Sequence, residues 1–145
     1  MDIKNVKLVI FDMDGLMLDT EQCYYYGVKE MCEKKKIKVD MSVYRAVIGT
    51  SGAIDMKKFN KSNYPDDVVE KMVCQYVENR RIELCEEGVA TKKGLHKLLN
   101  TLNERKILKV VATSTPKSIA KKLLERVGIE KEFSFVISTE DVKKG

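Results

Sequence analysis

Three short apolar runs stand out along a chain whose other apolar positions recur with helical spacing. Residues 6–11, 107–112 and 133–137 are rich in β-branched residues. Each run therefore predicts a short buried strand. Before and after the second run, apolar positions return every three or four residues, which is typical of a helix packed on one side. Strands that alternate with helices indicate an α/β protein with a parallel sheet.

The long segment between the first and second runs is predicted to be wholly helical. Capping residues and apolar spacing predict helices at residues 20–36, 43–48, 53–59 and 65–88, and core helices at residues 94–105 and 116–128. We expect Asp19 or Thr20 to cap the first of these helices and Ser42 to cap the second. The chain then divides into a core, residues 1–19 and 89–145, and a helical insert, residues 20–88.

Composition indicates a globular protein and argues against some classes of binding partner. Of 145 residues, 43% are hydrophobic and the net charge is +5, so a core can form. Lysines are mixed with acids, which favours a solvated surface over a nucleic-acid interface. We find no apolar stretch near the roughly 20 residues of a membrane span and no signal-peptide pattern. The four cysteines form no CxxC pair, so we expect reduced thiols in a cytoplasmic protein.

The candidate chemistry follows directly after the first apolar run. The stretch "FDMDGLMLDT", residues 11–20, places Asp12, Asp14 and Asp19 within eight residues. The hydroxyl-rich turn that starts with Thr113 follows the second run. Because the carboxyl ends of parallel strands meet at one edge of a sheet, we expect the two segments to face one crevice.

This arrangement suggests phosphate chemistry. The turn offers hydroxyls and backbone amides at a helix N-terminus, which suits an anion. Two acids beside an anion would repel it unless a cation intervened, so we predict Mg²⁺ held by Asp12 and Asp14. One carboxylate could attack phosphorus and the other could move protons. For Asp19, a simple role as helix cap is the alternative.

Two motifs carry a family resemblance. "FDMDGLMLDT" resembles the first motif of the haloacid dehalogenase (HAD) superfamily, DxDGxxxD[TS], and "VVATST", residues 110–115, resembles the second, an apolar strand that ends in Thr or Ser. The helical segment is similar to the cap of the branch that includes β-phosphoglucomutase and phosphoglycolate phosphatase. The resemblance implies a HAD-type Rossmannoid core, of which this chain would hold three parallel strands, with an inserted α-helical cap.

The resemblance also implies roles for individual residues. Asp12 would be the nucleophile and a Mg²⁺ ligand. Asp14 would be the general acid/base, with its carbonyl oxygen on the metal. Thr113 and Ser114 would hold the transferring phosphoryl group. Asp19 and Thr20 would form the hinge into the cap.

An acid at position 14 is typical of the phosphatases and mutases of the family, so the implied activity is that of a Mg²⁺-dependent phosphatase on a small phosphorylated metabolite. A sugar-phosphate mutase is the alternative enzyme. In β-phosphoglucomutase an arginine after the second cap helix binds the distal phosphate, whereas Gly52 stands there in this sequence. Glu83 likewise replaces a lysine, which favours a phosphatase. Arg45 and Thr50 are the candidates for substrate contact, and for Arg45 a solvated surface position is the alternative.

The sequence departs from the family pattern after the third apolar run. Relatives continue with a third motif, a lysine usually followed by proline, and a fourth, an acidic pair. Neither is found here, and Lys143 and Lys144 stand too early to take the lysine's role. We therefore expect the N-terminal part of a phosphatase that is weak or inactive as a 145-residue chain. Its first strand would lie at a sheet edge, and such an edge permits self-association. A non-catalytic product that associates through this edge stays an open alternative.

Overall fold

The computed structural model describes residues 5–48 and 53–142, and its contacts divide the chain into two compact units. Met1–Asp19 and Leu84–Gly145 form the core unit, and Thr20–Glu83 form the helical unit. Thr50 and Gly52, which entered the sequence predictions, lie outside the described residues. Each unit is therefore described by itself.

The core unit contains a three-stranded parallel sheet, as predicted. Its strands are β1 (Leu8–Phe11), β2 (Leu108–Ala112) and β3 (Val136–Ile137), in the spatial order β1-β2-β3. Leu8 pairs with Leu108, and Val111 pairs with Val136. The α/β fold class predicted from the apolar runs is thus confirmed.

The third strand is shorter than the predicted range of residues 133–137. A 3₁₀ turn, η1 (Glu130–Glu132), precedes it, and the Phe133 amide bonds to the carbonyl of Glu130 at 3.2 Å. The Phe133 ring meets the Phe11 ring edge to face, with centroids 5.6 Å apart. Phe133 thus fills the core from the turn rather than from the strand.

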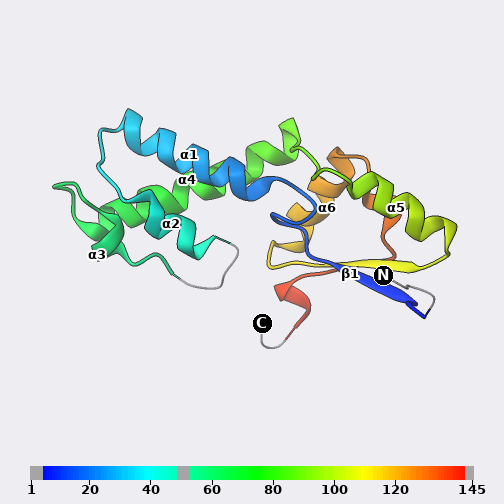
Figure 1. The fold of residues 1–145 in the computed structure, drawn as a ribbon. Coiled ribbons are helices and arrows are strands. Elements are labelled where there is room, and N and C mark those ends of the chain that lie inside the picture. The colour runs from blue at the N-terminus through cyan, green and yellow to red at the C-terminus, as the bar shows by residue number, and fades with distance from the viewer. Residues whose placement is uncertain (1–4, 49–52, 143–145) are drawn as a thin grey trace. The chain divides into compact units, whose positions relative to one another are not determined.

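Both helices of the alternating pattern cover the same face of this sheet (Figure 1). They are α5 (Leu95–Glu104) and α6 (Lys117–Arg126). Their buried side chains are Leu95, Leu99, Leu102, Ala120, Leu123 and Leu124. These residues recur at helical spacing, which explains why the pattern predicted both helices.

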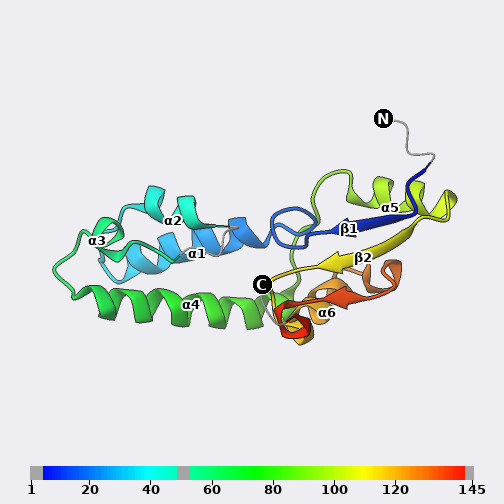
Figure 2. The ribbon, with the colours of Figure 1, turned by 90° about the horizontal axis from the view of Figure 1, so that it is seen from below.

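The other face of the sheet stays uncovered in the described part of the chain, and Figure 2 views the unit from this side, with α5 and α6 behind the strands. Successive residues of a strand point to opposite faces. Phe11 is only 4% exposed, whereas its neighbour Ile10 is 63% exposed. The exposed large apolar residues on or next to the strands are Leu8, Ile10, Leu108, Phe135 and Ile137. The prediction of buried strands therefore does not hold for these five residues, although Val110, which pairs with Ile10, is buried.

The helical unit is built from α1 (Thr20–Lys34), α2 (Met41–Val47), α3 (Met56–Phe59) and α4 (Asp66–Glu87), the last of which runs past the unit boundary. Its buried core consists of Val28, Met31, Cys32, Ile37, Tyr44, Phe59, Val69 and Val73. This core is separate from that of the sheet and consists of side chains from the helices and the loop after α1.

The second and third helices begin at other residues than predicted. Asp40, not Ser42, caps α2: its Oδ1 atom accepts the Ser42 amide at 3.0 Å and the Ser42 hydroxyl at 2.6 Å. Asp and Ser are about equally good N-caps, so local propensity does not choose between them, and the helix begins two residues earlier than predicted. In the same way Asp55 caps α3, which is a single turn instead of the predicted seven residues.

No helix in the described ranges combines the length and apolar character that crossing a lipid bilayer requires.

Candidate active site

The acidic loop after β1 folds back tightly on its own backbone. The amides of Met17 and Leu18 both donate to the carbonyl of Met13, each at 3.0 Å, and the Gly15 amide donates to the carbonyl of Leu18 at 2.9 Å. Gly15 has a φ of 73°, a left-handed conformation that glycine adopts without strain. Met13 and Met17 are fully buried, so the loop is anchored on both sides of Asp14.

Residues 90–92 hold the far end of this loop. The Asp19 amide donates to the carbonyl of Ala90 at 2.9 Å, and the Lys92 amide donates to the carbonyl of Met17 at 2.8 Å. The Lys92 ammonium also pairs with Asp19 Oδ1 at 2.8 Å. Thr20 is buried and begins α1. No local pattern pointed to Lys92, because it lies 73 residues from Asp19.

The turn after β2 meets the acidic loop at Asp14. The hydroxyl of Thr113 donates to Asp14 Oδ2 at 3.1 Å, and the hydroxyl of Thr115 donates to the same oxygen at 2.7 Å. Both threonines are buried, whereas Ser114 between them is exposed. The structure thus brings Asp14 and Thr113 together, and it adds Thr115, which sequence reasoning noted in the turn but did not assign to the site.

Asp12 lies at the surface end of the same loop. Its Oδ1 atom accepts the amide of Met13 at 2.9 Å. Burial raises the pKa of Asp12 above its ordinary value, the Met13 hydrogen bond opposes this shift, and the negative charge of Asp14 adds to it. A bound cation would remove the repulsion between the two carboxylates.

The oxygen donors of this loop fit Mg²⁺ only in part. Among the described residues, no three acidic, histidine or cysteine side chains gather into a set that could hold a metal ion. Mg²⁺ usually binds one or two protein carboxylates, and waters and substrate phosphate complete its shell. Asp12 and Asp14 meet that smaller requirement, so the described residues fit a site that needs substrate or further ligands to be complete.

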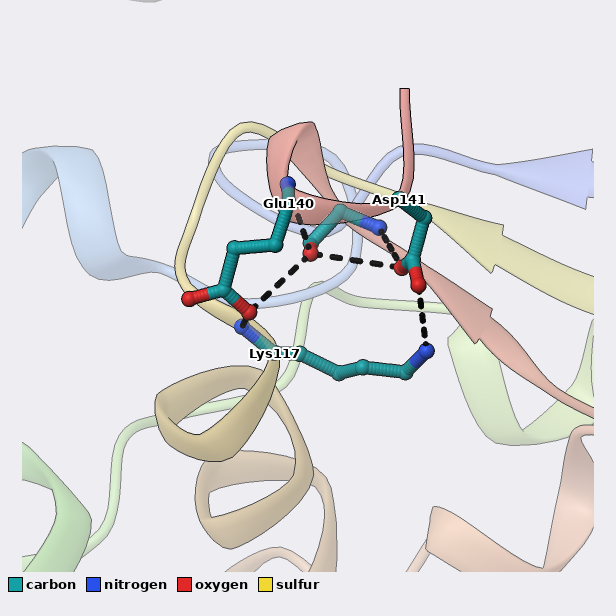
Figure 3. A network of polar contacts seen from close by, with 4 residues as sticks. Lys117, Glu140 and Asp141 are labelled. Atoms are coloured by element: carbon teal, nitrogen blue, oxygen red, sulfur yellow. Dashed lines mark hydrogen bonds and ion pairs between the residues drawn. The ribbon is translucent and has the colours of Figure 1, made fainter. Parts of the chain in front are cut away.

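A second polar network ties the segment after β3 to the start of α6 (Figure 3). Ser138 and Asp141 form a capping box around the 3₁₀ turn η2 (Thr139–Asp141). Glu140 Oε2 accepts the backbone amide of Lys117 at 3.2 Å, and the Lys117 ammonium pairs with Asp141 Oδ1 at 2.8 Å. Part of the predicted anion cradle at this helix N-terminus is therefore already used by a side-chain carboxylate.

The residues predicted for substrate contact belong to the helical unit. Arg45 lies on α2, is exposed, and places its guanidinium carbon 4.5 Å from the centroid of the Tyr25 ring. Thr50 lies outside the described residues. The contact with Tyr25 holds Arg45 in one orientation, and its role toward a substrate stays a prediction.

Known proteins match this chain along almost its whole length. A model of the haloacid dehalogenase-like hydrolase family matches residues 9–145. The phosphorylated carbohydrates phosphatase of Thermotoga maritima is 25% identical over 140 residues, which are 97% of this chain and 64% of the relative.

Two solved structures have the same fold. The β-phosphoglucomutase of Clostridium difficile matches with a TM-score of 0.63 and 20% identity, over 97% of this chain and 65% of that one. A predicted phosphoglycolate phosphatase of Haemophilus somnus matches with a TM-score of 0.72 and 14% identity, over 99% of this chain and 67% of that one. The chain thus spans just under two thirds of the length of the curated relatives it matches.

Proposed function

The chain belongs to the haloacid dehalogenase-like hydrolase family, and on that premise we propose that its protein is a Mg²⁺-dependent phosphatase acting on a small phosphorylated metabolite. The observation that carries the proposal is a pair of hydrogen bonds. The hydroxyls of Thr113 and Thr115 both donate to Asp14, which follows Asp12 by two residues. In this proposal the nucleophile, the proton carrier and the hydroxyl donors to the phosphoryl group come from two loops that follow adjacent strands.

In the proposed reaction, the Asp12 carboxylate attacks phosphorus and the ester P–O bond breaks, which leaves an aspartyl phosphate. Asp14 gives its proton to the leaving alkoxide and later takes one from the water that hydrolyses the aspartyl phosphate. Thr113 and the Ser114 amide donate to the phosphoryl oxygens. Mg²⁺, when bound by the Asp12 carboxylate and the Asp14 carbonyl oxygen, would offset the negative charge of the phosphoryl group.

The helical unit is proposed to act as the cap that covers the substrate, with its boundaries near residues 20 and 88. Asp19 and Thr20 would serve as the hinge, and the ion pair of Asp19 with Lys92 would fix the core side of that hinge. Arg45 and Thr50 would contact the part of the substrate remote from phosphorus. Such a cap would exclude water from the reacting phosphoryl group.

The substrate class is proposed from the names of relatives. The phosphorylated carbohydrates phosphatase of T. maritima supports a sugar phosphate or a similar metabolite. The likeness to a β-phosphoglucomutase keeps a sugar-phosphate mutase as the second candidate. Activity that depends on an added sugar bisphosphate would identify the mutase, and hydrolysis without it would identify the phosphatase. None of the four cysteines, all of which the structure describes, is in a disulfide bond. Reduced cysteines suit a reducing compartment, so we place the protein in the cytoplasm.

We propose that residues 1–145 by themselves hydrolyse phosphate esters weakly or not at all. The described part of the chain brings no three acidic, histidine or cysteine side chains together for a metal ion, and the charge stabilisation that a bound metal supplies usually contributes several kcal/mol. The protein from the complete reading frame is therefore the one to assay. If it too were inactive, the non-catalytic alternative, a chain that associates through the edge of its sheet, would stand.

Substitution of the two acids tests the proposal. Asp12→Asn removes the nucleophile and should abolish hydrolysis of p-nitrophenyl phosphate. Asp14→Asn removes the proton carrier and should lower kcat by about 10²- to 10⁴-fold. Asp67→Asn is the matched control, because Asp67 is an exposed acid on α4. Full activity of Asp12→Asn in a folded protein would overturn the proposed mechanism.

A further inference from the structure

Two threonine hydroxyls converge on one carboxylate oxygen in the core unit. Thr115 donates to Asp14 Oδ2 at 2.7 Å and Thr113 donates to the same atom at 3.1 Å. Thr115 is 6% exposed and Thr113 is 9% exposed, so water competes little for either hydroxyl. Hydrogen bonds between hydroxyls and carboxylates are short and strong at about 2.5–2.7 Å, so the bond from Thr115 is the stronger of the two.

Thr113 cannot keep its bond to Asp14 during the proposed reaction. A hydroxyl has one proton to donate, and in this structure Thr113 gives it to Asp14 while it accepts the amide of Thr115 at 3.1 Å. If Thr113 donates to a phosphoryl oxygen, as proposed above, that proton leaves Asp14. Asp14 then needs another hydrogen-bond donor during the step in which it delivers a proton to the leaving oxygen.

Thr115 has no such conflict. Its amide already bonds to Thr113 Oγ1, and that contact fixes the turn so that its own hydroxyl reaches Asp14. We propose that Thr115 is a positioning residue, which keeps the Asp14 carboxyl group in place while Thr113 transfers its hydrogen bond to the phosphoryl group. This inference rests on the proposed phosphatase function.

Two substitutions separate the hydroxyl from the rest of the side chain. Thr115→Val keeps the shape and removes the donor, whereas Thr115→Ser keeps the donor. In the protein from the complete reading frame, with p-nitrophenyl phosphate, we expect Thr115→Val to lower kcat by about 10- to 100-fold, the range of one hydrogen bond to a charged group. KM should change by less than about threefold, because a positioning residue acts through Asp14 and not through substrate binding. Thr115→Ser should restore most of kcat.

A spectroscopic measurement on residues 1–145 tests the hydrogen bond without any activity. The ¹³C chemical shift of the Asp14 carboxyl carbon should change in Thr115→Val and return in Thr115→Ser. Thr101→Val is the control, because the Thr101 hydroxyl donates to the Lys97 carbonyl within α5, at 2.9 Å, and not to Asp14. This variant should leave both the shift and kcat unchanged.

The outcomes separate this inference from the function on which it rests. An active wild type whose Thr115→Val variant keeps its kcat would overturn the positioning role alone. An Asp14 carboxyl signal that does not respond to Thr115→Val would overturn the hydrogen bond itself. A wild-type protein without phosphatase activity would overturn the proposed function, and the catalytic role of Thr115 with it, whatever the carboxyl signal does.

Discussion

Lys109 carries a charge into the interior of the core unit. Lys109 is only 4% exposed. Its ammonium group pairs with Glu132 Oε2 at 2.9 Å and also donates to Asn103. The Asn103 amide donates to the same Glu132 oxygen at 2.8 Å. The three residues come from β2, α5 and η1 and link these elements. A buried ammonium group is costly unless it is paired.

Removing Glu132 should therefore destabilise the fold more than removing the buried charge of Lys109. We expect Glu132→Ala to lower the free energy of unfolding by about 1–3 kcal/mol, since it leaves Lys109 buried and unpaired. Lys109→Met, which removes the charge and keeps the apolar stem, should cost less. Urea denaturation of the two variants checks this expectation. Glu125→Ala is the control, because Glu125 is exposed on α6. The reverse order would contradict the assignment of a buried charge to Lys109.

The same pair predicts a pH dependence. The hydrogen bond from Asn103, followed by that from Lys109, holds the pKa of Glu132 below its ordinary value of 4.5. A carboxyl group whose pKa is lower in the folded state stabilises the fold above pH 4.5, and this stabilisation is lost as the pH falls through the folded-state pKa. The stability difference between wild type and Glu132→Gln should thus shrink below pH 4.5. A constant difference from pH 7 down to pH 3 would contradict this.

At the scale of residues, local motifs predicted only part of the site. Asp12 and Asp14 were found because they follow an apolar run at fixed spacing. The partners Thr115 and Lys92 were not assigned, because only the folded chain brings them to Asp14 and Asp19. Lys109 was missed for a related reason, since a lysine within an apolar run gives no sign of its ion pair.

At the scale of elements, the packing of α1 against α4 depends on one glycine. A Cβ atom added at Gly27 would collide with the ring of Tyr76. Alanine is a better helix former than glycine by about 1 kcal/mol, so propensity and packing oppose each other at this position. The collision involves the hydroxyl oxygen and two ring carbons of Tyr76, and we expect packing to win.

A double-mutant cycle tests this balance. Gly27→Ala should destabilise the wild-type protein, whereas the same change in a Tyr76→Leu background should be neutral or stabilising, by up to about 1 kcal/mol. Thermal and urea unfolding of the four proteins give the coupling energy. Equal effects of Gly27→Ala in both backgrounds would show that the contact with Tyr76 is not limiting.

Periodicity predicted the existence and order of the elements, but not their ends. The α2 helix begins at Met41 because the Asp40 side chain accepts the amide of Ser42, and β3 is short because Phe133 turns into the core. Both outcomes depend on competition between neighbouring side chains, which spacing alone does not resolve.

At the scale of the whole molecule, the uncovered face of the sheet is the feature that the pattern could not predict. Parallel strands are normally covered on both faces, so their apolar runs look the same whether one face or two are packed. We propose that the edge of β1, next to this face, mediates association of two copies of residues 1–145. An unpaired apolar strand edge is a template for pairing with another chain, and contiguous exposed apolar residues mark interaction surfaces.

One substitution at the edge strand tests the association. Ile10 is 63% exposed on β1, and Ile10→Lys should shift residues 1–145 toward the monomer in analytical ultracentrifugation, since charged edge residues oppose strand pairing. Ile82→Lys is the matched control, because Ile82 is 51% exposed but lies on α4. A wild-type chain that stays monomeric at all concentrations would contradict self-association.

The central claim is that Asp12 receives the phosphoryl group, and one measurement addresses it directly. The protein from the complete reading frame would be mixed with Mg²⁺ and a phosphate ester, quenched in acid within milliseconds, digested and examined by mass spectrometry. The account predicts that the peptide with residues 11–20 carries one phosphoryl group on Asp12, and that Asp12→Asn abolishes it. Turnover of the ester with no phosphoryl group on this peptide at any quench time would contradict the account.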